Sequence, residues 1–253
     1  MAPHARDAVI EVEGLRTRFG NQVVHDGLDF RIDRGELVAI IGGSGTGKSV
    51  LLRAIAGLQR PNGGRLRLFG ADVWAPGTDL DPVRRRIGML FQDGALFSSL
   101  SVAQNVAVPL REHTSLPADL IEQVVLLRLA LAGLDERAAS KMPSELSGGM
   151  RKRAGIARAL ALEPEVLFLD EPTSGLDPVT ARAFDALMLS LNRDLGLTVL
   201  LITHDLDTLA SIASRIIVLG NGKVIADGTL EAVRSNADPW VQSYFSTRPT
   251  PAA

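Results

Sequence analysis

A short apolar segment that runs into a glycine-rich loop constrains the fold of this chain more than any other feature. Residues Leu37–Ile41 are continuously apolar and lie between two glycines, as expected for a strand buried on both faces. The loop Gly42–Ser49 reads GGSGTGKS and matches the G-x-x-x-x-G-K-[ST] pattern. A helix is predicted from Lys48 to about Ala56. Strand, loop and helix in this order predict a site for the phosphates of a nucleoside triphosphate.

The chemistry of that loop follows from its glycines. They let the backbone curl so that several N–H groups converge on one anion, and the helix N-terminus that follows also favours negative charge. Lys48 is expected to reach the β- and γ-phosphates, and the Ser49 hydroxyl to ligate Mg²⁺. A flexible turn is the alternative, which the preceding buried strand disfavours. The loop residues expected to bind ATP are Gly42, Gly43, Ser44, Gly45, Thr46, Gly47, Lys48, Ser49 and Val50.

Two acidic residues end another apolar segment. Val166–Leu169 is predicted to be a strand, and Asp170 and Glu171 follow it directly. Beside a phosphate loop, Asp170 is suited to hold Mg²⁺ through its water shell, and Glu171 to orient and deprotonate an attacking water. Alone this motif is weak, because many buried strands end in a capping acid.

A second glycine motif, Ser147-Gly148-Gly149, opens a basic stretch that is predicted to be helical to near Leu162. Ser147 can cap this helix, whose N-terminus then favours an anion. An ordinary helix start with small residues has the same sequence. The order of the motifs along the chain decides between these interpretations.

Composition restricts the class of protein. The chain has 253 residues, 46% of them hydrophobic, which is ample for a buried core in one or two domains. A net charge of −2 and a pI of about 6.1 give no basic field for nucleic acid, and the chain has no cysteine. No apolar run approaches the ~20 residues of a membrane span, and Met1–Ala8 lacks the apolar core of a secretory signal. We expect a soluble protein that acts at a membrane only through a partner.

Strand and helix patterns alternate at both ends of the chain and flank a helical middle. The predicted strands are Val9–Arg18, Val23–Ile32, Leu37–Ile41, Leu66–Phe69, Ile87–Phe91, Val166–Leu169, Val199–Thr203 and Ile216–Leu219. Residues 101–160 lack strands, and helices are predicted at Pro117–Leu131, Val179–Leu195 and Leu206–Ala213. This order predicts a parallel α/β core interrupted by an all-helical insertion.

Six motifs occur in the order and approximate spacing of one family. They are Gly42–Ser49, Gln92, Ser147-Gly148-Gly149, Asp170-Glu171, Ser174-Gly175-Leu176-Asp177 and His204. From about Val9 to Thr229 the chain resembles the ATPase subunit of ABC transporters. The resemblance implies an α/β P-loop NTPase (RecA-like) core with an antiparallel β edge and an inserted all-helical subdomain. It implies a single ABC ATPase domain over 1–253, with 1–94 and 161–230 as catalytic core, 95–160 as helical signature subdomain and 231–253 as a C-terminal helical tail.

The resemblance also implies that ATP and Mg²⁺ lie between two copies of the chain in a head-to-tail homodimer. Ser147, Gly148 and the Gly149 N–H would contact the γ-phosphate held by the loop of the opposite copy, and Asp177 would lie at the seam. Phosphoryl transfer depends mainly on positioning and charge stabilisation, so splitting the donors over two chains would tie hydrolysis to dimer closure.

The other site residues are implied in the same way. Gln92 would sense Mg²⁺ and the attacking water and relay that state to a membrane partner, and His204 would hold the γ-phosphate. Phe19 would stack on adenine in place of the usual tyrosine, and keeps the aromatic face. Met150 stands where glutamine is usual and loses its polar contacts, but neither departure predicts an inactive subunit. The implied catalytic residues are Glu171, His204 and Gln92, and the implied Mg²⁺ ligands, through nucleotide and water, are Ser49, Gln92 and Asp170.

Three segments narrow the resemblance. Leu146–Arg153 reads LSGGMRKR, Met89–Thr114 ends in AVPLREHT, and the tail from Gly228 to Phe245 is also similar. They resemble the ATPases of bacterial MCE-type lipid transporters, including the Mla phospholipid system. The resemblance implies an integral membrane permease, a periplasmic MCE-domain lipid-binding protein and sometimes a STAS-domain subunit as partners. It implies a peripheral location on the cytoplasmic face of the inner membrane.

Three other functions stay open. They are transport of another hydrophobic solute such as a sterol or an aromatic compound, a soluble ABC ATPase without a transport role, and a non-catalytic nucleotide-gated regulator. The absence of a long coiled-coil insertion and of a basic stripe disfavours the soluble ATPase. Intact Lys48, Asp170, Glu171 and His204 disfavour the regulator.

Several further residues have two interpretations. Phe97, Leu100 and Val102 are candidates for a groove that receives a permease helix, or for ordinary core. The basic runs at 84–86 and 151–153 are interpreted as solvated helix faces, with phosphate or membrane contact as the alternative. His25 and His113 lack metal-ligand spacing, so we expect no metal beyond the Mg²⁺ of the nucleotide.

Overall fold

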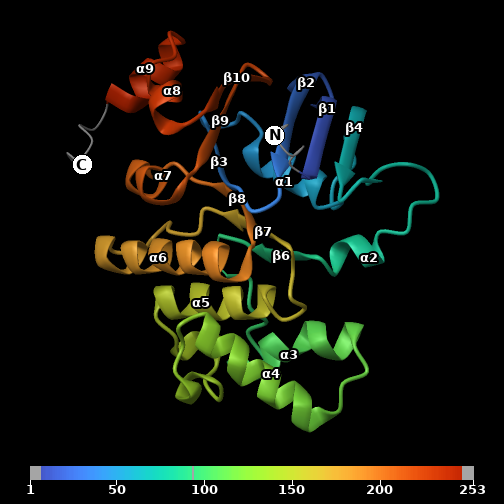
Figure 1. Cartoon of the computed structure of the whole chain (residues 1–253), viewed down its shortest axis with the longest axis vertical. Helices are drawn as coiled ribbons and strands as arrows, with labels where there is room; N and C mark the ends of the chain where they lie inside the picture. Colours follow the sequence, from blue (N-terminus) through green and yellow to red (C-terminus); the bar gives the residue numbers. More distant parts are fainter. Residues whose placement is uncertain (1–6, 93, 247–253) are drawn as a thin grey trace, which may run out of the picture. The chain divides into compact units, whose positions relative to one another are not determined.

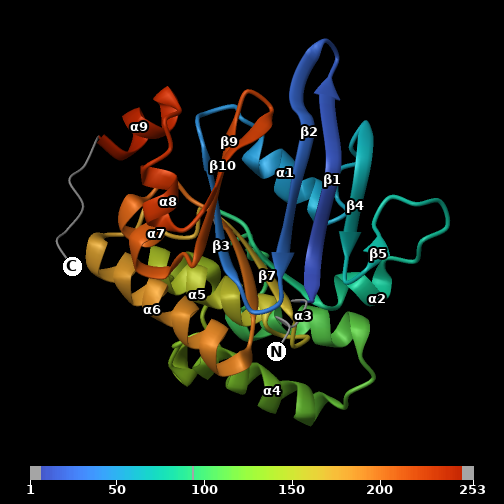
Figure 2. The ribbon, with the colours of Figure 1, turned by 45° about the horizontal axis from the view of Figure 1, so that its top comes forward.

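The computed structural model describes residues 7–92 and 94–246 (Figures 1 and 2). The chain divides into two compact units, one made of Met1–Val83 and Leu200–Ala253 and the other of Arg84–Val199. Helix α2 (Asp81–Arg84) and strand β8 (Thr198–Ile202) lie at the two boundaries along the chain.

The first unit contains an antiparallel sheet with the strand order β2-β1-β4-β5. Its strands are β1 (Ala8–Phe19), β2 (Gln22–Asp33), β4 (Gly63–Leu68) and β5 (Ala71–Asp72). Val12 of β1 lies opposite Phe30 on one side and Leu66 on the other, and all three side chains are buried. Both views show β2, β1 and β4 side by side (Figures 1 and 2). The predicted antiparallel edge is confirmed.

The same unit contains the strand that leads to the phosphate loop. β3 (Leu37–Gly42) pairs in parallel with β9 (Arg215–Gly220), and β9 pairs antiparallel with β10 (Lys223–Gly228). Helix α1 (Lys48–Ile55) follows β3, and α7 (Leu206–Ile212) precedes β9. The first five residues of β3 are all buried, so the apolar run anchors the strand and brings the glycine loop to its carboxyl end.

Two short helices, α8 (Leu230–Arg234) and α9 (Pro239–Ser246), end the described chain. α8 contacts β9, β10 and α9. On α9, the rings of Trp240 and Tyr244 stack with centroids 5.0 Å apart, and Phe245 meets Tyr244 edge to face at 5.2 Å. The helical tail predicted through Phe245 therefore consists of two helices with an aromatic cluster on the second.

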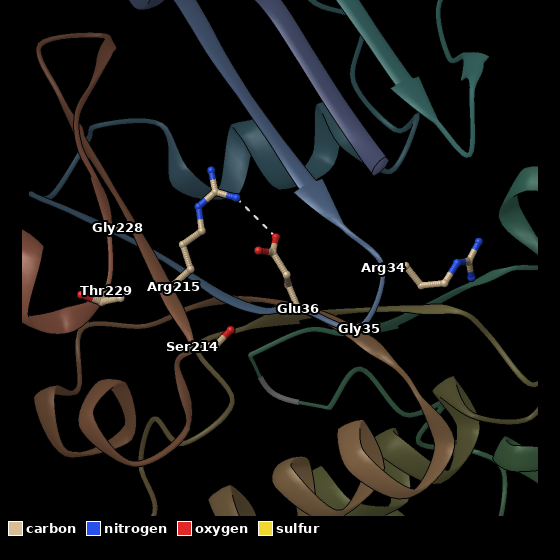
Figure 3. Close-up of a pocket in the computed structure, with 7 residues that line it drawn as sticks. All are labelled: Arg34, Gly35, Glu36, Ser214, Arg215, Gly228 and Thr229. Atoms are coloured by element: carbon tan, nitrogen blue, oxygen red, sulfur yellow. Dashed lines mark hydrogen bonds and ion pairs between the residues drawn. The ribbon is translucent and has the colours of Figure 1, made fainter. Parts of the chain in front are cut away.

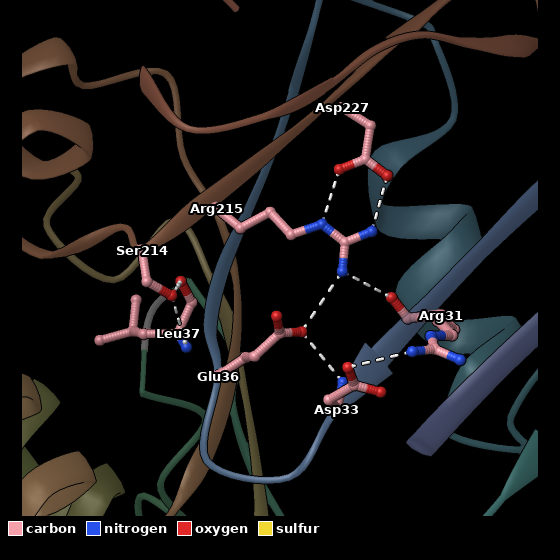
Figure 4. Close-up of polar contacts among 7 residues, drawn as sticks. All are labelled: Arg31, Asp33, Glu36, Leu37, Ser214, Arg215 and Asp227. Atoms are coloured by element: carbon pink, nitrogen blue, oxygen red, sulfur yellow. Dashed lines mark hydrogen bonds and ion pairs between the residues drawn. The ribbon is translucent and has the colours of Figure 1, made fainter. Parts of the chain in front are cut away.

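An ion-pair cluster joins the beginnings of β3 and β9 (Figure 4). Arg215 makes a bidentate interaction with the Asp227 carboxylate, at 2.6 and 2.7 Å. Its third guanidinium nitrogen donates to Glu36 at 3.3 Å and to the Arg31 carbonyl oxygen at 2.9 Å. Arg215, Glu36 and Thr229 line a cavity of about 480 Å³, while the Arg34 side chain points away from Arg215 (Figure 3). The cluster therefore joins β9 and β10 to the start of β3 and to the backbone of β2, at the end of β3 opposite the glycine loop.

The second unit begins with β6 (Ile87–Leu90), which pairs in parallel with β7 (Val166–Asp170). The regular elements that the described residues form between them are helices and 3₁₀ turns, namely α3 (Val102–His113), α4 (Ala118–Leu131), η1 (Glu136–Ala138), η2 (Pro143–Glu145) and α5 (Gly148–Ala159). Helix α6 (Pro178–Leu195) follows β7. The strand-free middle of the chain is confirmed, and no helix in the described ranges is both long and apolar enough to span a membrane.

Candidate nucleotide site

The glycine loop is held so tightly at its start that only glycine fits. A Cβ on Gly42 would lie 2.5 Å from the Leu219 carbonyl oxygen and 2.8 Å from Thr46 Oγ1. Thr46 Oγ1 in turn donates to the Gly43 carbonyl at 2.9 Å. Helix α1 then begins at Lys48, and its N-cap residue Gly47 supplies no side-chain cap. Its first N–H groups therefore have no side-chain acceptor from this cap, which suits an anion.

Lys48, the first residue of α1, extends back over the loop. Its ammonium donates to the carbonyl oxygens of Gly42 at 2.7 Å and Gly43 at 3.0 Å. Ser49 and Val50 follow in the first turn of the same helix. The loop, its lysine and the Ser49 hydroxyl thus lie on one strand–loop–helix element, as the sequence predicts.

A buried histidine lies directly behind the loop. His25 of β2 is 1% exposed, and its Nε2 and Val24 Cγ1 lie so close to Gly47 that a side chain there would collide with both. Gly47 also has a φ of 88°, in the left-handed region. Burial, opposed in part by the Gly47 backbone, lowers the pKa of His25 below its ordinary value. His25 therefore packs against the loop as a neutral ring.

Two further predicted residues lie on the first unit. His204 follows β8 and is exposed, and its carbonyl oxygen accepts a 3.0 Å hydrogen bond from the Tyr244 hydroxyl. Phe19 ends β1 and is 50% exposed, which leaves ring surface available for stacking. Trp240 Nε1 lies 3.3 Å from the position that a Cβ on Gly43 would take. Sequence reasoning missed this contact between the aromatic cluster of α9 and the glycine loop.

The second glycine motif lies on the second unit, at the start of α5. Ser147 caps this helix, and its Oγ accepts a 3.2 Å bond from the Met150 N–H, as predicted. Its own hydroxyl proton can still donate outward. A Cβ on Gly149 would lie 2.6 Å from Thr180 Cγ2, so any side chain there would force Thr180 to shift where α5 approaches α6.

Asp177 caps α6. Its Oδ1 accepts from the Val179 and Thr180 N–H groups at 3.0 Å, and its Oδ2 from the Thr180 hydroxyl at 2.5 Å. The side-chain hydrogen bond from Thr180 is the main cause that lowers the pKa of Asp177. Asp177 therefore remains ionised at neutral pH and exposed at the start of this helix.

The acidic pair lies at the end of β7. Asp170 is the last residue of the strand, and Glu171 has a φ of 50°, which is unusual for a residue other than glycine. Backbone strain of this kind concentrates at functional sites. The turn is closed by the Ser174 N–H, which donates to the Glu171 carbonyl oxygen at 3.2 Å.

One basic run differs from its predicted environment. Lys152 is only 6% exposed, and its ammonium donates to the carbonyl oxygens of Gln92 at 2.9 Å and Glu171 at 3.2 Å. Arg153 is half-buried and donates to the Ala132 and Gly133 carbonyl oxygens, so only Arg151 is exposed. The solvated-face prediction for 151–153 is therefore wrong for Lys152, whose buried ammonium donates to backbone oxygens.

The other residues with two interpretations differ in their exposure to solvent. Arg84 and Arg85 are exposed as predicted, while Arg86 is paired with Glu165. In the segment after Gln92, Val102 is fully buried core and Phe97 is 52% exposed. The buried Asn105 fixes this segment, because its side chain accepts from the Phe97 N–H at 2.7 Å and donates to the carbonyl oxygens of Phe97 and Leu100.

The geometry of the first unit defines a class of protein. A buried parallel strand, a glycine loop that tolerates no Cβ at its first and last turns, and an uncapped helix with a lysine at its start fit the triphosphate of ATP. The fold and this element are those of a P-loop NTPase. The first unit contains Phe19, the glycine loop and His204. The second unit contains Gln92, the second glycine motif, Asp170, Glu171 and Asp177.

Comparison with known proteins identifies the family. The profile of the ABC transporter family matches residues 25–174. The phospholipid transport ATP-binding protein MlaF of Haemophilus influenzae is 43% identical over 94% of this chain and 90% of its own length, and MlaF of Escherichia coli is 43% identical over 94% and 88%. The methionine import ATP-binding protein MetN of Brucella abortus is also 43% identical, over 96% of this chain and 66% of its own length.

Two solved structures of ABC ATP-binding proteins resemble this chain and agree with the family match. The ATP-binding cassette MJ0796, in a dimeric post-hydrolysis state bound to ADP and Pi, has a TM-score of 0.79 and 32% identity over 87% of this chain and 98% of its own. The structure of cbiO1 from Clostridium perfringens, part of an ABC transporter complex, has a TM-score of 0.80 and 32% identity over 95% and 91%. The chain belongs to the ABC transporter family, and it is an ATP-binding subunit with ATPase activity.

Proposed function

We propose that this chain powers a bacterial inner-membrane transporter of MCE/Mla type that moves phospholipid or a related lipid between the inner and outer membranes. The main support is the identity to two phospholipid transport ATP-binding proteins over nearly the whole of both chains. The proposed partners are an integral permease, a periplasmic MCE-domain lipid-binding protein and a STAS-domain subunit. The exposed Phe97, held by Asn105, is proposed to contact the permease at the cytoplasmic face of the membrane.

The proposed site is composite. Lys48 and the glycine loop of one copy hold the triphosphate, and the Ser147 hydroxyl and Gly149 N–H of a second copy donate to the γ-phosphate. Glu171 takes the proton of the attacking water, and Gln92 and His204 position water and phosphate. Ser49 and Asp170 would hold Mg²⁺, which would supply positive charge that offsets the charge of the phosphates. A relative solved as a dimer with ADP and Pi supports the proposal that two copies of this chain associate.

Mixing two variants tests the composite site. Lys48→Ala removes the phosphate lysine, whereas Ser147→Asp keeps a good helix cap and places a carboxylate against the phosphate. Each variant alone is expected to lose hydrolysis. Mixed, they form heterodimers with one intact site, so part of the activity returns. No recovery, in dimers shown to have exchanged subunits, would place the whole site within one chain.

A transport assay tests the cargo. The complex that contains this chain is isolated from membranes, placed in phospholipid vesicles and supplied with radiolabelled phospholipid or radiolabelled methionine. ATP-dependent transfer of phospholipid that is lost with Glu171→Gln is expected. Movement of methionine instead would favour the second candidate, a solute importer, which the equal identity to the methionine import protein suggests.

A further inference from the structure

The Lys152 side chain contacts two proposed catalytic positions of the second unit, Gln92 and Glu171. It lies on α5, five residues after the Ser147 cap, so it is about 7.5 Å further along the helix. Its ammonium donates to the backbone of Gln92 and to the backbone of Glu171. A buried ammonium is retained only where it is well paired, so this placement has a cost that the two carbonyl oxygens offset.

Both contacts act on backbone that needs support. Glu171 has the left-handed φ of 50°, and its carbonyl oxygen accepts from both Lys152 and the Ser174 N–H. Gln92 is exposed and lies two residues after the end of β6. The carbonyl oxygens of Gly94 and Ala95 lie further along the segment after β6. They accept hydrogen bonds from Arg158 of α5, at 3.1 Å and 2.6 Å respectively.

Helix α5 comes close enough to make these contacts because of Gly155. A Cβ there would lie 2.5 Å from Leu90 Cδ1 and 3.2 Å from the Gly94 carbonyl oxygen. Helix backbone and segment therefore meet directly, and Lys152 and Arg158 flank the point of contact. The helix that begins with the second glycine motif thus sets the backbone around Gln92.

We propose that Lys152 is a positioning residue for ATP hydrolysis. Its hydrogen bonds hold the Gln92 and Glu171 backbones in fixed positions relative to α5, the helix that Ser147 caps. This inference rests on the proposed roles of Gln92 and Glu171. Because errors of about 1 Å in position can cost as much as 10²-fold in rate, loss of this ammonium should act on turnover and leave ATP binding by the first unit intact.

The test compares Lys152→Met with Lys152→Arg and with Arg153→Met, in the complex isolated from membranes. Arg153 is a matched control, because it also donates to two carbonyl oxygens from α5, but those of Ala132 and Gly133. We expect Lys152→Met to lower kcat at least 10-fold with an unchanged Kd for ATP, and Lys152→Arg to recover most of it. Arg153→Met should lower the thermal midpoint and keep kcat within about twofold.

Two results would overturn the proposal: a kcat for Lys152→Met close to that of the wild type, or equal losses of kcat in Lys152→Met and Arg153→Met. If Lys152→Met does not fold, Lys152→Gln, which keeps a shorter N–H donor, is measured against the same control and the same limits. Glu171→Gln is measured in parallel. Full hydrolysis by Glu171→Gln would refute the proposed catalytic role, whereas an inactive Glu171→Gln beside a fully active Lys152→Met would refute this inference alone.

Discussion

The Tyr244 hydroxyl donates a 3.0 Å hydrogen bond to the backbone carbonyl oxygen of His204. A helix near the C-terminus thereby holds the backbone of the residue proposed to contact the γ-phosphate. Trp240, stacked on Tyr244, packs against Gly43 of the glycine loop. The aromatic cluster of α9 therefore supports two parts of the nucleotide site in the first unit.

Removing that hydroxyl should slow hydrolysis. Tyr244→Phe keeps the ring and its stacking but loses one hydrogen bond worth ~1 kcal/mol, so kcat should fall about fivefold with little change in ATP affinity. A double-mutant cycle with His204→Ala checks whether the effect on kcat acts through His204, because Tyr244→Phe should then have no further effect in the His204→Ala variant. Ser246→Ala, which removes a hydroxyl bond to the Ser243 carbonyl on the same helix, is the control. Equal effects of the two hydroxyl deletions would contradict the prediction.

Glu171→Gln should separate binding from chemistry. The amide keeps the shape of the side chain but cannot take a proton from water, so turnover should fall about 10²–10⁴-fold while ATP still binds. Glu163→Gln is a matched control, since Glu163 also has a left-handed φ, of 54°, and is paired with Arg128. Phosphate release and fluorescent-nucleotide binding measure the two quantities. Comparable rates for the two variants would show that Glu171 is not the base.

His25 should make stability depend on pH below neutrality. Burial lowers its pKa in the folded chain below the ordinary value of 6.5, so the unfolded chain binds more protons as the pH falls. Its contribution to stability is therefore complete above pH 6.5 and is lost progressively below it, toward the folded-state pKa. Thermal midpoints of wild type and His25→Leu, measured from pH 8 to pH 5, should diverge in this window. His113→Gln, at an exposed histidine, should follow the wild type.

Arg215→Met should destabilise the first unit. It removes the paired bonds to Asp227 and leaves Glu36 and the Arg31 carbonyl without this donor, a loss of about 3 kcal/mol. For a chain of this size the thermal midpoint should drop by roughly 6–12 °C. Arg215→Lys should recover only part of it, because an ammonium cannot make the two-pronged contact. An unchanged midpoint for Arg215→Met would show that the cluster adds nothing to stability.

Local patterns predicted most of the elements. The apolar run of β3, the glycine loop and the Ser147 cap are each encoded by neighbouring residues, and each is found within a residue or two of its predicted place. β10 was missed, although Asn221-Gly222, with φ angles of 50° and 74°, is the strongest short signal for a hairpin. The sequence therefore contains a local signal for this hairpin.

Tertiary contacts could not be predicted in this way. Nothing near Lys152 in the sequence distinguishes it from a solvated lysine, because its acceptors lie 60 and 19 residues away. The same holds for Tyr244, whose partner is 40 residues distant. The roles of Gln92, His204 and Asp177 came from motif order and remain predictions, whereas the family itself is established by comparison.

The left-handed backbone of Glu171 has an evolutionary consequence. A side chain in that conformation costs ~1 kcal/mol that glycine would not incur, so folding by itself favours the loss of this carboxylate. Lineages that no longer needed turnover would drift toward glycine or asparagine at this position and gain robustness. With Glu171 in its proposed role as the base, an acid at this position in a related chain would indicate selection for ATP hydrolysis, and its loss would indicate an inactive relative.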